Sequence, residues 1–214
     1  MCVHCRGLVP LPPMLDRHAL PLLQRLLHPL AQALVRAGVG ANSVTLAGFG
    51  IGLLAAVLIA SHAYLAGAGA IFASRLLDGL DGAVARQTAP TDAGGFLDIA
   101  LDFLFYASIP LAFAEADPAT NALAAAVLLA AFIGTGSSFL AFAVLAAKRG
   151  LASSAYPDKS FYFLGGLTEG TETLACFAAM CLWPQHFAVL AYGFAALCAV
   201  TIATRLWWGW RSFQ

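Results

Sequence analysis

A succession of long apolar segments, separated by short links, constrains this chain more than any other feature. Each segment approaches the roughly 20 apolar residues that a helix needs to cross a lipid bilayer. Inside a bilayer every backbone N–H and C=O group must find a partner within the protein, which a helix provides by itself. Only 10% of the residues are charged, too few to cover a water-exposed surface. The sequence therefore predicts an all-α integral membrane protein, a bundle of about six transmembrane helices.

An amphipathic stretch precedes the first apolar segment. Residues 19–37 carry leucines at helical spacing with polar residues mostly elsewhere, which predicts an N-terminal interfacial amphipathic helix. A helix packed on the cytoplasmic end of the bundle is the alternative. Asn42 and Ser43 are candidate caps for the helix that follows. We expect a disordered tail at 1–18 and one membrane domain at 19–214, with transmembrane helices at 43–61, 64–86, 95–116, 120–147, 160–183 and 187–210.

The basic residues favour one orientation in the membrane. Lys and Arg occur before the first predicted transmembrane helix and after the last one. They also occur in the links after the second and fourth helices, as Arg86, Lys148, Arg149 and Lys159, and in none of the other links. Because short cytoplasmic loops are enriched in Lys and Arg, both termini are expected in the cytoplasm. A formal net charge of +0 gives no indication of a nucleic-acid partner.

Four aspartates lie on the second and third predicted helices. Asp78 and Asp81 are three residues apart, and Asp98 and Asp102 are four apart, so each pair shares one helix face. The short link makes the two helices antiparallel neighbours. A carboxylate costs about 2.5–3.5 kcal/mol in a bilayer, and all-oxygen ligation favours magnesium, manganese or calcium. The pattern predicts a divalent-cation site of the kind that pairs two metals for phosphoryl chemistry.

Ion pairing is the structural alternative for these aspartates. Arg75 and Arg86 lie on the same helix as the first pair, but two arginines cannot neutralise four carboxylates. Gly82 and Gly94 would let a ligand approach the backbone closely, and a helix that begins near Gly94 could receive a phosphate at its N-terminus. Close packing between helices is the alternative for the glycines.

The spacing of these residues resembles the signature of a known family, the CDP-alcohol phosphatidyltransferases. All eight signature positions match in the stretch Asp78-x2-Asp81-Gly82-x2-Ala85-Arg86-x7-Gly94-x3-Asp98-x3-Asp102. The stretch Gly40-Ala41-Asn42-Ser43-Val44-Thr45 is also similar to the family, although many members have proline where this chain has Ala41. The resemblance covers nearly the whole chain after Met14.

This resemblance implies a six-helix bundle, usually homodimeric, in a bacterial inner membrane, with the active site open to the cytoplasm. Such enzymes transfer a phosphatidyl group from a CDP-linked donor, usually CDP-diacylglycerol, to an alcohol acceptor and release CMP. By this match Asp78, Asp81 and Asp98 would ligate two Mg²⁺ or Mn²⁺ ions, and Asp102 would be a metal ligand and the general base. The residues that would line the CDP site are Gly82, Ala85, Arg86 and Gly94.

The sequence does not identify the alcohol acceptor. Glycerol phosphate, inositol phosphate, serine, choline and a second lipid all remain open. Charged residues outside the signature form a candidate acceptor pocket: Lys159, Glu169, Glu172 and Arg75. Polar residues at membrane depth usually face the bundle interior. Hydrogen bonding between helices is the alternative for the two glutamates.

Two other functions are compatible with aspartates on paired membrane helices. An intramembrane prenyltransferase would hold a prenyl diphosphate through magnesium, but the residues that follow Asp81 and precede Asp102 argue against it. A divalent-cation transporter would use the carboxylates as an ion site. Transporters commonly contain internal repeats, and the sequence has no second copy of the aspartate pattern.

Overall fold

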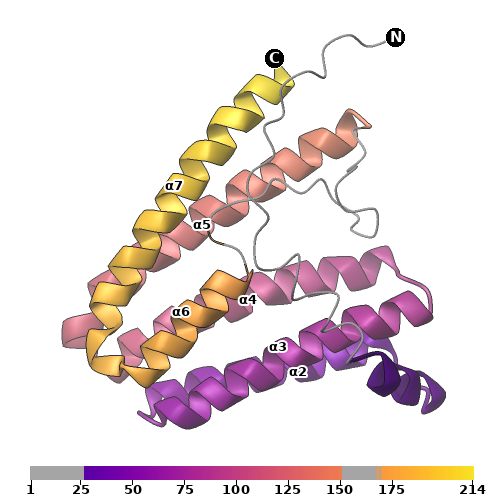
Figure 1. Ribbon diagram of the computed structural model, residues 1–214, viewed down its shortest axis with the longest axis horizontal. Helices are drawn as coiled ribbons and strands as arrows, with labels where there is room; N and C mark the ends of the chain where they lie inside the picture. Colours follow the sequence, from indigo (N-terminus) through magenta and orange to yellow (C-terminus); the bar gives the residue numbers. More distant parts are fainter. Residues whose placement is uncertain (1–26, 151–167, 169) are drawn as a thin grey trace.

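The computed structural model describes residues 27–150, 168 and 170–214, and the regular elements among these residues are all helical (Figure 1). This confirms the all-α prediction. α2 (Ala41–Ala60) and α3 (Tyr64–Gln87) form a hairpin, and α4 (Asp92–Ala116) packs on α2. α5 (Pro118–Lys148) contacts α4 and runs beside α7 (Phe187–Phe213). α4 therefore lies between two pairs of helices, α2 and α3 on one side and α5 and α7 on the other.

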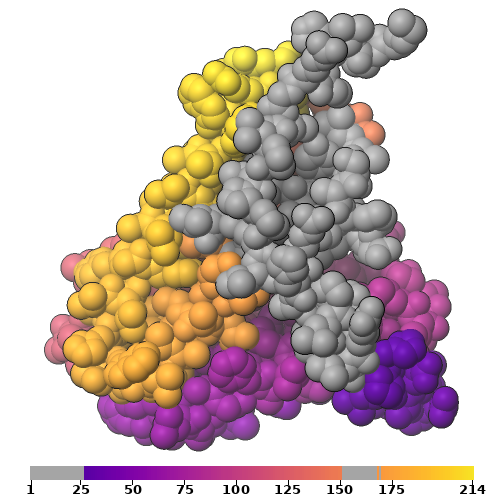
Figure 2. All heavy atoms as spheres, viewed as in Figure 1, coloured from indigo at the N-terminus to yellow at the C-terminus, as the bar shows by residue number. Residues whose placement is uncertain are grey.

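The remaining described elements join these two sides. α6 (Gly170–Leu182) contacts both α3 and α7, and a 3₁₀ turn, η1 (Pro184–His186), links it to α7. The space-filling view shows the orange atoms of α6 lying directly on the purple α2–α3 hairpin (Figure 2). The described helices thus form one continuous packed unit.

Four of the described helical stretches are long and apolar enough to cross a membrane: Ala41–Ala60, Asp92–Ala116, Pro118–Lys148 and Pro184–Phe213. α3 is 24 residues long, but its charged residues lower its hydropathy. α6 is a shorter apolar helix, and residues 160–167 and 169 of the predicted helix 160–183 lie outside the described residues. The chain is an integral membrane protein, and the number of six spans stays a prediction.

Residues 27–36 are helical and form the described part of the predicted interfacial helix. Ala31 is fully buried and packs with Val44 of α2 and Leu80 and Val84 of α3. Leu30 is half exposed. This helix therefore packs on the bundle through one face. The predicted tail at 1–18 and the start of the helix at 19–26 lie outside the described residues.

The helix ends follow the predicted boundaries within a few residues, with one error in capping. The N-cap of α2 is Gly40, with no side-chain hydrogen bond, so Asn42 and Ser43 lie inside the first turn. The prediction that they cap this helix was wrong because the helix begins earlier, at Ala41. Thr91 caps α4 by accepting a hydrogen bond from the Gly94 N–H at 3.1 Å. A hydroxyl of this kind satisfies one of the unpaired amides at a helix start.

Small residues allow α2, α3 and α4 to approach closely. A Cβ added to Gly52 of α2 would lie 2.6 Å from the Phe105 ring of α4 and 3.1 Å from the Ser74 hydroxyl of α3. The Ser74 hydroxyl donates a hydrogen bond to the Gly48 carbonyl at 2.8 Å, and Ser74 is completely buried. Glycine at position 52 is therefore required by the packing of three helices against one another.

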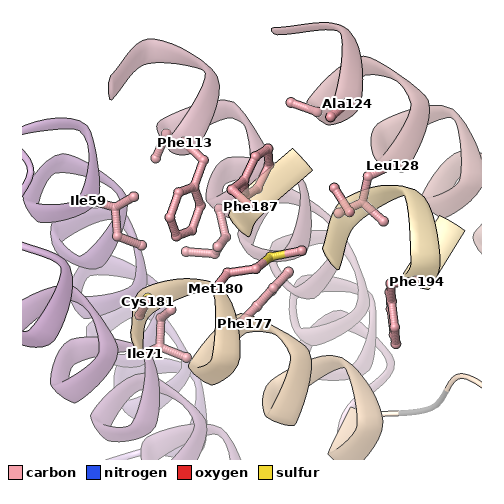
Figure 3. Packing of buried hydrophobic residues seen from close by; sticks show 14 of the residues in the cluster. Ile59, Ile71, Phe113, Ala124, Leu128, Phe177, Met180, Cys181, Phe187 and Phe194 are labelled. Atoms are coloured by element: carbon pink, nitrogen blue, oxygen red, sulfur yellow. The ribbon is translucent and has the colours of Figure 1, made fainter. Parts of the chain in front are cut away.

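An aromatic core fills the end of the bundle where α2 meets α3 and α4 meets α5 (Figure 3). Phe113 stacks on Phe187 with ring centroids 4.6 Å apart, and both side chains are fully buried. Ile59, Phe177 and Met180 pack in the same cluster. This core joins helices from both sides of α4. It thereby fixes the position of α3 relative to α4, the two helices that carry the aspartates.

Candidate active site

α3 and α4 bring three of the four aspartates together. Asp78, Asp81 and Asp98 each offer a carboxylate oxygen, and these three oxygens all lie within 4.8 Å of one another. Asp78 and Asp81 share one face of α3, and Asp98 faces them from the first half of α4. This confirms that the two aspartate-bearing helix faces meet. We call Asp78, Asp81 and Asp98 the carboxylate triad.

The fourth aspartate, Asp102, is engaged by an arginine. The Arg75 Nη1 atom donates to Asp102 Oδ1 at 2.5 Å and lies 3.4 Å from Asp78 Oδ1. The guanidinium carbon is 4.0 Å from the centroid of the Phe105 ring. Ion pairing, weighed as an alternative from the sequence, is therefore present for two of the aspartates. It links Asp102 to the edge of the carboxylate triad.

The carboxylate triad suits a hard divalent cation. Asp81 is 5% exposed, and its Oδ2 atom is buried without a hydrogen-bond partner among the described residues. A buried carboxylate oxygen without a partner is costly unless a cation binds it. The donor set consists of carboxylate oxygens only, which suits magnesium or manganese better than zinc. The residues present therefore fit the predicted metal site.

A pocket adjoins the triad and is walled by three helices. It is lined by Asp78, Asp98, Asp102 and Arg75, together with Leu101 of α4 and three residues of α2: Thr45, Gly48 and Phe49. Sequence analysis missed the contribution of α2 as a wall. The available signal was the similarity of the stretch 40–45 to the family, which includes Thr45. The pocket therefore borders two members of the triad, Asp78 and Asp98, as well as Asp102.

The four residues predicted to line a CDP site lie near the link between α3 and α4. A Cβ at Gly82 would lie 3.3 Å from an Arg86 Nη atom, so the glycine leaves room for the arginine to fold back along α3. A Cβ at Gly94 would lie 2.9 Å from Asn42 Oδ1. Ala85 is partly buried, one residue before the exposed Arg86. Gly82 and Gly94 are likewise partly buried, and none of the four residues lines the described pocket.

The candidate acceptor residues are only partly described. Glu172 lies in the first turn of α6 and is partly buried, but it does not line the described pocket. Lys159 and Glu169 lie outside the described residues. Just before α6, the Thr168 hydroxyl donates to the Thr201 hydroxyl of α7 at 3.1 Å. Of the four candidates, the structure brings Arg75 alone among the described residues to the triad.

The sequence and the fold were compared with known proteins. The model of the CDP-alcohol phosphatidyltransferase family matches residues 39–207. The chain is 55% identical over 201 residues to the inner membrane protein YnjF of Escherichia coli K12, covering 94% of this chain and 98% of that protein. It is 41% identical over 85 residues to the archaetidylinositol phosphate synthase of Methanothermobacter thermautotrophicus, covering 39% of this chain and 42% of the synthase.

Two solved structures share the fold. The crystal structure of phosphatidylinositol phosphate synthase (PgsA1) of Mycobacterium tuberculosis with CDP-DAG bound superposes with a TM-score of 0.69 and 23% identity, over 87% of this chain and 94% of that chain. The complex of the same enzyme with manganese and citrate gives a TM-score of 0.68 and 22% identity, over 86% and 88%. At this identity the likeness concerns the fold alone.

The family match extends over most of the chain and includes α2 to α6 and most of α7. It contains the carboxylate triad, Asp102 and the residues at the end of the α3–α4 hairpin. The similarity to YnjF extends over nearly the full length of both proteins. The chain is therefore a membrane-embedded transferase of substituted phosphate groups and belongs to the CDP-alcohol phosphatidyltransferase family.

Proposed function

We propose that this enzyme transfers a phosphatidyl group from CDP-diacylglycerol to an alcohol acceptor and releases CMP, as a step of phospholipid biosynthesis. The observation that carries the proposal is the carboxylate triad, whose three oxygens converge within 4.8 Å beside a pocket. Further support comes from the solved relative with CDP-DAG bound, which shares the fold. The donor diphosphate needs cationic charge, and the triad can hold it.

Asp78, Asp81 and Asp98 would hold two divalent cations, Mg²⁺ or Mn²⁺. The unpartnered Oδ2 atom of Asp81 supports this assignment, as does the manganese complex of the solved relative. When bound, such ions neutralise the donor diphosphate and stabilise the leaving phosphate. Asp102 would serve as a ligand near the metals in addition to its role as a base.

The chain's own residues would bind and orient the donor. Arg86 can pair with a phosphate of CDP, because its guanidinium carries donors suited to phosphate oxygens. Gly82 leaves Arg86 the space to fold back along α3. Ala85 and Gly94 present no bulk at the same end of the hairpin, so the nucleotide can approach the backbone there.

Asp102 would act as the general base. It lines the pocket from α4, one helical turn beyond Asp98. In the proposed step the acceptor hydroxyl oxygen bonds to the lipid-bearing phosphorus, and its proton passes to the Asp102 carboxylate. The bond between that phosphorus and the bridging diphosphate oxygen breaks, and CMP leaves with the electron pair. A carboxylate can take this proton when it lies within hydrogen-bond reach of the hydroxyl.

The acceptor is proposed only as an alcohol, with phosphorylated polyols as the first class to test. Two of the similar proteins are by name an archaetidylinositol phosphate synthase and a phosphatidylinositol phosphate synthase. Lys159, Glu169, Glu172 and Arg75 are the proposed contacts for the acceptor head group. Arg75 is already engaged with two carboxylates, so the other three are the stronger candidates for direct contact.

The proposed setting is a bacterial inner membrane, with both termini and the pocket facing the cytoplasm, and a homodimer as the assembly. The distribution of Lys and Arg supports this orientation, as does the 55% identity to an inner membrane protein. Single cysteines placed at His62 and Gln185 should react with an impermeant label from outside the cell. A cysteine at Ala89 should react only after permeabilisation, and the opposite pattern would reverse the assigned orientation.

A turnover assay tests the proposed reaction. The purified protein in detergent micelles is mixed with labelled CDP-diacylglycerol, magnesium and a panel of alcohols: inositol phosphate, glycerol phosphate, serine, choline and phosphatidylglycerol. We expect CMP release that depends on one acceptor and is absent in Asp81→Asn. Prenyl transfer from a prenyl diphosphate, or manganese flux into proteoliposomes without CMP release, would instead support one of the two alternative functions.

A further inference from the structure

Arg75 is a buried cation inside the active site. Its side chain is 13% exposed, one helical turn before Asp78 on α3. Nη1 contacts Asp102 and Asp78, and Nη2 lies 3.4 Å from the Ser74 hydroxyl. The Nε atom is buried and has no hydrogen-bond partner among the described residues. The polar edge of this guanidinium is therefore directed at two aspartates.

The other side of the guanidinium rests on aromatic rings. Its central carbon lies 4.0 Å from the Phe105 centroid and 5.5 Å from the Tyr106 centroid. Phe105 is completely buried and is in turn held by the close approach of α2 at Gly52. A stacked arginine of this kind gains cation–π attraction and has few other rotamers available. The packing thus fixes the position of the positive charge.

The positive charge of Arg75 lies closer to one of the four aspartates than to the others. The closest contact of Arg75 is to Asp102, the aspartate outside the carboxylate triad. Its contact to Asp78 is longer, at 3.4 Å, and the three triad oxygens still lie within 4.8 Å of one another. An opposite charge at this distance competes with any other cation for the Asp102 carboxylate.

We propose that Arg75 is a positioning residue, a tethered counter-cation that competes with the divalent cations for the Asp102 carboxylate. While Arg75 holds one oxygen of Asp102, this carboxylate binds the metals less tightly and stays oriented toward the pocket for proton transfer. The inference rests on the proposed metal site at the triad. The Nη1 atom of Arg75 is already engaged with carboxylates, so Lys159, Glu169 and Glu172 remain the stronger candidates for direct contact with the acceptor.

Manganese binding tests the inference without any turnover. Wild-type protein, Arg75→Gln and Arg75→Lys are purified in detergent and titrated with Mn²⁺ alone, with free Mn²⁺ followed by electron paramagnetic resonance. Loss of the cation frees the Asp102 carboxylate for the metal, so Arg75→Gln should bind Mn²⁺ about tenfold more tightly, the scale on which groups around metal ligands act. Arg75→Lys keeps the charge and should stay close to wild type.

Tighter binding is diagnostic because local damage would weaken the site. The double variant Arg75→Gln, Asp102→Asn should lose the gain, since it has no carboxylate to release. The exposed Arg211→Gln removes the same charge far along the chain and should leave Mn²⁺ binding unchanged. Unchanged or weaker binding in Arg75→Gln, with wild-type binding intact, would overturn this inference alone. Absence of Mn²⁺ binding at the triad in both the wild-type protein and Arg75→Gln would overturn the proposed metal site as well.

Discussion

The two ends of the α3–α4 pair are built on opposite principles. At one end Tyr64, Phe113 and Phe187 stack in an aromatic cluster. At the other end the same two helices carry four aspartates, a buried arginine and a pocket. The aromatic end gains its stability from tight packing, whereas the aspartate end keeps charges together that would repel one another without a cation. The comparison teaches that α3 and α4 are held in place at their aromatic end, whereas the residues suited to chemistry lie at their aspartate end.

Metal removal should have the largest effect, and it acts at the aspartate end alone. Treatment with EDTA should abolish CMP release, because the three triad carboxylates lose the charge that neutralises the donor diphosphate. Added Mg²⁺ or Mn²⁺ should restore turnover in the wild type but not in Asp81→Asn. The measurement is CMP release before and after chelation. Full turnover in a metal-free preparation would contradict the assignment of the triad.

Removal of the proposed base, Asp102, should have the second-largest effect on turnover. Asp102→Asn should lower turnover about 10²–10⁴-fold, the usual contribution of a general base, while much of the affinity for CDP-diacylglycerol remains. Asp98→Asn is the matched comparison, and it should weaken metal and donor binding together. Binding isotherms and rates at saturating acceptor separate the two effects. Near-normal turnover in Asp102→Asn would reject this base and direct attention to Glu172 or Glu169.

Truncation at the aromatic end should affect stability without affecting chemistry. Phe113→Ala should lower the free energy of unfolding by about 3–5 kcal/mol, the range for a buried phenylalanine, because Phe113 is fully buried and stacked on Phe187. The rate per folded molecule should be retained at low temperature. Leu123→Ala, at a side chain 70% exposed, is the control for loss of apolar area at the surface. A Phe113→Ala protein with normal stability but no turnover would contradict the division of roles between the two ends.

The smallest expected effect concerns the cap between the two helices. Thr91→Ala removes the hydroxyl that accepts from the Gly94 N–H and should cost about 1 kcal/mol of stability. The start of α4 should loosen, so the apparent affinity for the CDP-linked donor should fall by a few fold. Thr91→Ser retains a hydroxyl and should restore both quantities. Thermal unfolding and donor titrations check this, and an unchanged Thr91→Ala protein would show that the cap has no part in the site.

The aspartates could be located from the sequence because two properties of nearby residues were sufficient. These are the helical spacing of the aspartates and the free-energy cost of a carboxylate in a bilayer. Asp78 and Asp81 share a face by spacing alone, and the short link brings Asp98 opposite them. The expected helix boundaries also followed from apolar length and the Asp117-Pro118 punctuation. Each of these inferences depends on residues close together along the chain, where geometry is fixed by the helix itself.

Other features depended on side-chain choices that a sequence does not specify. Arg75 could turn toward a substrate or toward the aspartates, and the Phe105 ring decides between them through tertiary contact. Asn42 resembles a cap by type, yet it points at Gly94 of another helix. The wall formed by Thr45 and Gly48 requires knowing which face of α2 meets α3. These relations arise only when three helices are packed together.

The short connection between α3 and α4 has a consequence for how the protein is made. The four aspartates all lie between positions 78 and 102, and only residues 88–91 separate the two helices. Contacts between positions so close in sequence require little loop-closure entropy and form early. Because α2 packs on both α3 and α4, the carboxylates can meet once α2 to α4 have inserted, before α5 to α7 are synthesised. A newborn chain would then gain from a cation at this stage, because binding would favour the packed arrangement of α2, α3 and α4 over the separated helices.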